Sequence, residues 1–126
     1  MLDTNIISVA HIHTIKKFML IEKYTESWAY KIIQNRFCNK MIFIDCMCSS
    51  GEYVSDNNET IYGTPVRVSN ILYNIAKKNT NKQIHLYFND YSKEKIQHLA
   101  GLLPNNLNNF RIFLSNGDGN QLLKQE

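Results

Sequence analysis

Apolar positions recur at helical spacing near the amino end of the chain. This pattern predicts a helix over residues 14–36, with Thr14 as its N-cap. The positions that we expect to face the core lie three or four residues apart: Ile15, Phe18, Ile21, Thr25, Trp28 and Ile32. The next segment, residues 41–44, is a short continuous apolar run. Such a run is typical of a strand in a parallel sheet that is buried on both faces.

Two further helices and strands follow in the same order. Thr64 and Pro65 suit the start of a second helix, and Ser92 suits the cap of a third helix that Pro104 stops. Residues 83–89 and 110–114 are apolar enough to form the second and third strands. The polar residues 51–63 predict a surface loop long enough to act as a lid.

The order of these elements predicts an α/β fold. A strand, a crossover helix and a second strand form a right-handed unit of a parallel sheet. We therefore expect a three-layer, doubly wound parallel sheet, with the helix over residues 14–36 packed on it. The length of 126 residues suits one domain, spanning residues 1–126, with one modest core.

Composition and charge count against nucleic-acid binding, a membrane partner and a metal site. The formal net charge is only +3 and the basic residues are scattered, so we do not expect nucleic-acid binding. The sequence shows neither a bilayer-length apolar run nor a basic flank followed by an apolar block, so we expect a cytoplasmic protein without a membrane partner. The three cysteines are Cys38, Cys46 and Cys48. Their spacing is unlike that of zinc sites, and we expect no metal.

A carboxylate stands at the end of each predicted strand: Asp45, Asp90 and Asp118. Ligands of doubly wound sheets bind beyond these strand ends. A nucleoside ligand needs an acceptor for its ribose hydroxyls, an acceptor near its adenine amino group and a tight turn for its charged tail. Asp90, Asp118 and the turn over residues 46–51 fit these roles. That turn contains only Gly51 and lacks a phosphate-loop lysine, so we do not expect it to cradle a phosphate.

These segments resemble the amino-terminal half of a known family. Ile44-Asp45-Cys46-Met47-Cys48-Ser49-Ser50-Gly51-Glu52-Tyr53 and Gly63-Thr64-Pro65 are similar to motifs of the three-Cys-motif partner family, as are His13-Thr14, Tyr24 and Trp28. The resemblance runs from about residue 13 to residue 118. Members of the family have a Rossmann-like fold of the S-adenosylmethionine-dependent methyltransferase type.

The resemblance implies S-adenosylmethionine as the cofactor. The residues that would contact it are Asp45, Cys46, Gly51, Asp90 and Asp118. Cys46 and Ser49 stand where the family usually has glycine, which leaves less room for a ligand and reduces the expected affinity. None of the four histidines is tied by spacing to a nucleophile, so we assign no catalytic residue.

The resemblance also implies an unfinished sheet. The methyltransferase sheet has seven strands, and this chain stops after the third, so we expect a truncated or degenerate member with doubtful catalysis. Residues 41–45 would then form an unpaired edge. We expect that edge to pair with a second copy, or with a separate chain that completes the sheet. The alternative function is a non-enzymatic interaction module that assembles through this edge.

Overall fold

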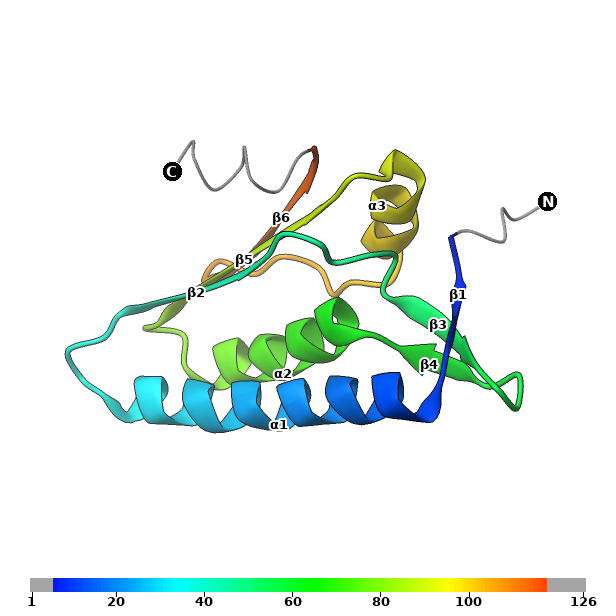
Figure 1. Ribbon diagram of the computed structural model, residues 1–126. Helices are drawn as coiled ribbons and strands as arrows, with labels where there is room; N and C mark the ends of the chain where they lie inside the picture. Colours follow the sequence, from blue (N-terminus) through cyan, green and yellow to red (C-terminus); the bar gives the residue numbers. More distant parts are fainter. Residues whose placement is uncertain (1–5, 118–126) are drawn as a thin grey trace.

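The computed structural model describes residues 6–117 and shows an α/β protein with three helices and two three-stranded sheets (Figure 1). The helices are α1 (Ile12–Gln34), α2 (Thr64–Lys78) and α3 (Lys93–Ala100). The strands are β1 (Ser8–Ala10), β2 (Lys40–Asp45), β3 (Glu52–Ser55), β4 (Thr60–Tyr62), β5 (Gln83–Asp90) and β6 (Phe110–Asn116). The helices and strands predicted from the sequence are all present, and three short strands are added.

The larger sheet is all-parallel and has the strand order β2-β5-β6. Lys40 pairs with Gln83 at the start of β2, and Ile84 pairs with Phe110 at the start of β6. Because the strands are parallel, all three carboxyl ends lie at the same edge of the sheet. The three predicted strands are thus confirmed, although β5 and β6 run further than predicted.

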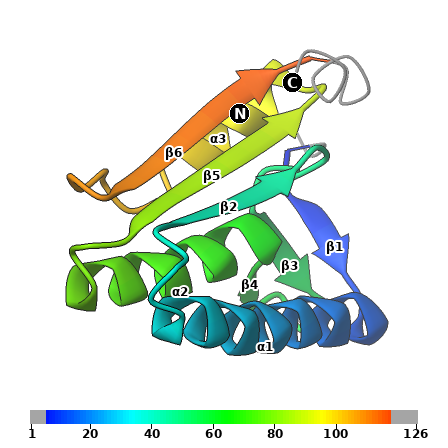
Figure 2. The ribbon, with the colours of Figure 1, turned by 90° about the vertical axis from the view of Figure 1, so that its left-hand side faces the viewer.

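The hydrophobic core fills one face of this sheet. Leu86 and Phe88 of β5 are fully buried and belong to one cluster with Leu72 of α2 and Leu99 of α3. In Figure 2, α3 lies behind β5 and β6. Helix α1 contacts α2, which lies between α1 and the sheet in Figure 1. Each large buried side chain contributes about 1.5–3 kcal/mol, so this cluster accounts for much of the stability of the fold.

The opposite face of the sheet is open. Ile42 and Ile44 of β2 are 46% and 39% exposed, and Phe113 of β6 is 41% exposed. The prediction that residues 41–44 are buried on both faces is therefore wrong, since only Met41 and Phe43 turn toward the helices. Within residues 6–117, helices pack on one face alone, so the described part of the chain holds no third layer.

Residues 51–63 form a β-hairpin instead of the predicted loop. Strands β3 and β4 pair antiparallel, and Ser55 accepts the backbone N–H of Asn58 at the turn. Strand β1 pairs parallel with β3, Ser8 opposite Tyr53, and completes the small sheet. The ring of Tyr53 also lies 5.0 Å from that of Phe18, between centroids. The segment is thus anchored to α1 and does not have the character of a lid.

The helix starts differ from the prediction in two of three cases. The N-cap of α1 is His11 and that of α2 is Gly63, and neither makes a side-chain capping bond. Thr14 and Thr64 lie inside their helices, so their predicted capping role is wrong. Ser92 is confirmed as the cap of α3, because its Oγ accepts the N–H of Lys95 at 3.2 Å.

The buried stripe of α1 is narrower than predicted. Thr25 and Ala29 are buried, whereas Ile21 and Trp28 are 39% and 38% exposed. Alanine lacks the bulk to separate two helices, so it allows α1 to approach α2 closely. The predicted contacts of Ile21 and Trp28 with the core are therefore wrong.

A buried asparagine joins three elements below the sheet. The Nδ2 of Asn109, before β6, donates to the carbonyls of Ala76, Asn79 and Lys82 at 2.9, 3.1 and 3.0 Å. These carbonyls belong to the end of α2 and to the turn that leads into β5. The carbonyls of Ala76 and Asn79 also accept the backbone N–H groups of Asn79 and Lys82, at 3.2 and 3.0 Å. Among the described contacts, the carbonyl of Lys82 has the Asn109 amide as its donor.

We predict that Asn109→Ala lowers the free energy of unfolding by about 1–3 kcal/mol, because it removes a buried amide and leaves the carbonyl of Lys82 without its donor. The measurement is urea denaturation followed by circular dichroism. Asn108→Ala is the matched control, since Asn108 is exposed and adjacent. A loss as large for Asn108→Ala as for Asn109→Ala would contradict this assignment.

Candidate functional site

The parallel register places two carboxylates at one edge of the sheet. Asp45 ends β2, and Asp90 ends the neighbouring strand β5. The loop over residues 46–51 starts at this edge and leads into β3. These residues form the candidate site, and four of the five cofactor contacts predicted from the sequence lie in it: Asp45, Cys46, Gly51 and Asp90. The fifth, Asp118, lies outside the described residues.

The loop follows the sheet edge through backbone hydrogen bonds. Met47 N–H donates to Oδ1 of Asp45 at 3.0 Å, and Cys48 N–H donates to the carbonyl of Asn89 at 2.9 Å. Ser49 then takes a positive φ of 62°, a left-handed conformation that costs a residue with a β-carbon about 1 kcal/mol. This local strain indicates that the surroundings impose the turn on the chain.

Asp90 supplies the main contact that imposes it. One carboxylate oxygen accepts the N–H of Ser49 at 2.9 Å, and the other accepts the N–H of Ser92 at 3.0 Å. One side chain therefore joins the loop, the central strand and the start of α3. A carboxylate can accept about four hydrogen bonds, so both oxygens keep capacity for a ligand.

Gly51 lets two helices pack against the end of the loop. Its φ is +78°, and a β-carbon at this position would lie 2.7 Å from Cδ1 of Leu99 and 2.9 Å from Cγ2 of Val66. Its carbonyl accepts the N–H of Gly63 at 2.8 Å, which fixes the start of α2. Gly51 is thus required for packing inside the protein, in addition to its predicted place beside a cofactor.

Asn89 is a site residue that sequence reasoning missed. It is buried, and its Nδ2 donates to the carbonyls of Cys46 and Gly117 at 3.1 and 2.9 Å. Its Oδ1 accepts the hydroxyl of Ser115 at 2.9 Å. This amide therefore joins the ends of all three parallel strands. Asn89 continues the apolar–polar alternation of β5, so nothing in the pattern distinguished it from an exposed strand residue.

Burial and mutual repulsion shift the acidity of two groups. Burial raises the pKa of Asp45, the bond from Met47 N–H lowers it, and the charge of Asp90 raises it further. Burial, with the charges of Asp45 and Asp90, raises the pKa of Cys48 to about 12. The Cys48 thiol is therefore protonated at neutral pH and buried in the core, so it is a poor nucleophile.

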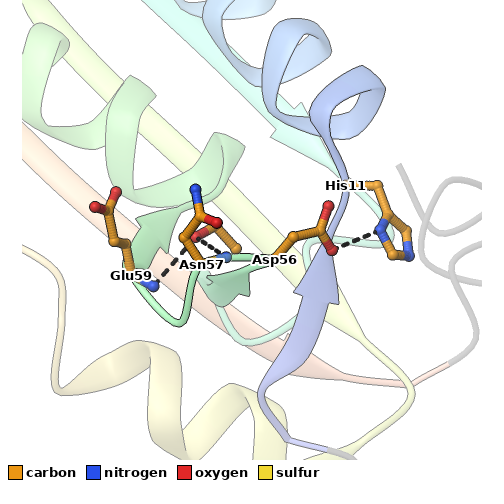
Figure 3. Close-up of polar contacts among 5 residues, drawn as sticks. His11, Asp56, Asn57 and Glu59 are labelled. Carbon is orange, nitrogen blue, oxygen red and sulfur yellow. Dashed lines mark hydrogen bonds and ion pairs between the residues drawn. The ribbon is translucent and has the colours of Figure 1, made fainter.

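Other polar pairs lie away from the strand ends. His11 Nδ1 and Asp56 Oδ1 are 3.0 Å apart and link the start of α1 to the β3–β4 turn (Figure 3). In the same turn, Ser55 Oγ accepts the N–H groups of Asn57 and Glu59. The His11–Asp56 pair is solvent-exposed, so it contributes little to stability.

Three further features concern metal sites, grooves and membrane spans. Among residues 6–117, no cluster of three or more His, Cys, Asp or Glu side chains could hold a metal ion. A groove of about 690 Å³ lies along α1 and Ile71 of α2, away from the strand ends. It is wide open and lined by surface side chains of α1, so the carboxylates at the strand ends are the better candidate for a ligand site.

No helix in the described part of the chain is long and apolar enough to span a bilayer.

Comparisons with known proteins give no relative for this chain. No family model matches it, and neither a curated protein nor a solved structure shows significant similarity to it.

We predict that Gly51→Ala lowers the free energy of unfolding by about 2–4 kcal/mol, through backbone strain together with overpacking against Leu99 and Val66. Gly101→Ala is the matched control. Gly101 has a helical φ of −74°, and an added β-carbon would meet only a carbonyl at 3.6 Å. We expect that control to change stability by no more than about 1 kcal/mol. Equal losses in thermal and urea unfolding for the two variants would refute the packing argument.

A second prediction concerns Asp45 and pH. Because its pKa is raised above the ordinary value of 3.8, the folded state binds this proton more tightly than the unfolded state does. Its contribution to stability is therefore favourable below about pH 3.8 and is lost as the pH rises through the raised pKa. Asp45→Asn keeps an acceptor for Met47 N–H and removes the charge.

We accordingly expect Asp45→Asn to unfold at a higher urea midpoint than the unmodified protein at pH 7. The difference should shrink as the pH falls toward 3.8. Asp56→Asn, which changes an exposed carboxylate, serves as the control. A lower midpoint for Asp45→Asn at pH 7 would show that its charge stabilises the fold.

Proposed function

We propose that this chain is a methyltransferase-like protein of the Rossmann-like type that binds the nucleoside part of S-adenosylmethionine. The observation that carries the proposal is the position of Asp90 at the carboxyl end of the central strand, beside the loop over residues 46–51. Nucleoside-binding sheets of this type use an acid at that position for the ribose hydroxyls. The resemblance of residues 44–53 to the three-Cys-motif partner family adds support.

Asp90 suits a ribose diol. It is partly exposed, and each of its oxygens accepts one backbone hydrogen bond, from Ser49 and from Ser92. The two backbone donors hold the carboxylate in one orientation and leave acceptor capacity for the ribose. A carboxylate that is already fixed loses little conformational entropy when a ligand binds.

The loop can admit the amino-acid part of the ligand despite its lost glycines. The side chain of Cys48 lies in the core, so it takes no space from a ligand on the outer surface of the loop. Ser49 already has the left-handed conformation that glycine would adopt, and it makes its contact with Asp90 through the backbone. Cys46 is partly exposed, and its side chain takes room that a glycine would leave free.

The proposal covers ligand binding and assigns no catalytic residue. His98 pairs with Glu52, at 3.0 Å, and His11 pairs with Asp56 on the surface. His85 lies on the open face of the sheet, where burial and the charges of Lys40 and Arg111 lower its pKa. Within residues 6–117, none of these side chains forms a hydrogen bond or ion pair with Asp45 or Asp90.

We predict that isothermal titration with S-adenosylmethionine or S-adenosylhomocysteine shows saturable binding. Asp90→Asn should weaken it by at least about tenfold, because a charge-assisted hydrogen bond to the ribose is lost. Asp56→Asn, a change of an exposed carboxylate on the β3–β4 turn, should leave the affinity unchanged. Absence of heat and of ligand-induced thermal stabilisation at millimolar concentrations of both ligands would overturn the proposal.

A further inference from the structure

One side of helix α1 faces solvent along its length. Figure 1 and Figure 2 show α1 as the outermost element of the described chain, with α2 and the larger sheet on its inner side. The buried residues Thr25 and Ala29 mark that inner side. At 3.6 residues per turn, the opposite side is the surface between the rows of Lys23 and Trp28, about 140° wide. We call this surface the outer face of α1, and every residue on it is exposed.

The charge of the outer face is entirely positive, and it comes from Lys16, Lys17, Lys23 and Lys31. None of these lysines forms an ion pair with a residue in the range 6–117. The two acidic residues of α1 lie on the flank next to α2, where Glu22 pairs with Arg67 at 3.4 Å and Glu26 lines the groove. A surface whose positive charges have no neighbouring acid attracts an anionic partner.

Large apolar side chains lie among these charges. Leu20 is 53% exposed and stands three or four residues from Lys16 and Lys17, so it is their neighbour on the helix surface. Tyr24 and Trp28 follow at steps of four residues and are 68% and 38% exposed. None of these three apolar side chains belongs to the hydrophobic core or to the side chains packed against it. The fold therefore leaves them free to contact a partner.

We propose that the outer face of α1 binds the surface of an anionic lipid bilayer, with the helix lying flat in the headgroup layer. A basic helix that also exposes Trp, Tyr and Leu side chains is suited to this interface, and it needs no membrane-spanning segment. The lysine ammonium groups contact lipid phosphates, and their long aliphatic stems lie beside Leu20 and Trp28. This proposal does not depend on ligand binding at Asp90.

The mixture of lysine and apolar side chains favours a bilayer over other anionic partners. Lysine is depleted in the cores of protein–protein interfaces, whereas here it surrounds Leu20. The outer face has no arginine, the residue that proteins use most for nucleic-acid recognition, and a phosphate backbone offers Leu20 no apolar contact. Tryptophan and tyrosine, in contrast, are enriched where a bilayer meets water.

The test is sedimentation of the protein with vesicles of phosphatidylcholine mixed with phosphatidylserine, and with vesicles of phosphatidylcholine alone. We expect saturable binding to the anionic vesicles, at least about tenfold tighter than to the neutral ones. Trp28 is the single tryptophan of the chain, so its fluorescence reports on this face alone. Its emission should shift to shorter wavelength on binding and be quenched by lipids with brominated acyl chains.

Lys17→Glu should weaken binding to the anionic vesicles at least about tenfold, because it replaces an attractive charge by a repulsive one. An acid is tolerated near the start of a helix, and circular dichroism would check that the variant folds. Lys93→Glu is the matched control. It changes the net charge equally at an exposed position near the start of α3, on the opposite side of the molecule from α1 (Figure 1), and should leave binding unchanged.

Leu20→Gln tests the apolar contact separately. Leu20 lies outside the core, so its replacement should keep the fold and weaken vesicle binding at least about threefold.

Four results would overturn the proposal. The protein would fail to sediment with the anionic vesicles. Lys17→Glu and Lys93→Glu would weaken binding equally, which would show attraction by net charge alone. Trp28 emission would stay unchanged during binding, which would place the contact on another face. Finally, a single-stranded oligonucleotide would bind the outer face more tightly than the vesicles do, which would identify nucleic acid as the partner.

Discussion

The carboxylate of Asp90 is the contact on which the geometry of the strand ends depends. Consecutive residues of a strand point to opposite sides, so Asp90 and its neighbour Asn89 act in different directions. Asp90 fixes Ser49 of the loop and Ser92 at the start of α3, whereas Asn89 fixes the backbone of Cys46 and Gly117. The end of β5 thereby holds the loop, both neighbouring strands and the next helix in one arrangement. A ligand at this edge would find its acceptor already oriented.

The sequence pattern predicted the elements that local periodicity controls. The main helices, the three parallel strands and the cap at Ser92 follow from spacing and turn chemistry within about ten residues. Strand β1 and the β3–β4 hairpin were missed, because their strands are only three or four residues long and Ser8 pairs with the distant Tyr53. Such non-local pairing leaves little trace in periodicity. Asp45, Cys46, Gly51 and Asp90 were brought together as expected, since parallel register alone aligns the strand ends.

The prediction that β2 is buried on both faces failed for a different reason. A continuous apolar run is compatible with burial on both faces, and only the elements that pack nearby decide whether both are covered. In the described part of the chain, Met41 contributes to the core while Ile42 stays exposed. The apolar residues of the strand are therefore divided between a buried face and an exposed face of the sheet.

The charges at the strand ends are relevant to the kind of ligand that the loop accepts. Burial raises the pKa of Asp45, and the nearby charge of Asp90 raises it further, so this edge disfavours additional negative charge. An anionic ligand such as a phosphate would add negative charge here, and the loop offers no lysine or arginine to offset it. A ligand that carries positive charge beside a nucleoside would reduce the negative charge. In the function that we propose, the sulfonium and ammonium groups of S-adenosylmethionine, which outnumber its one carboxylate, would supply this positive charge.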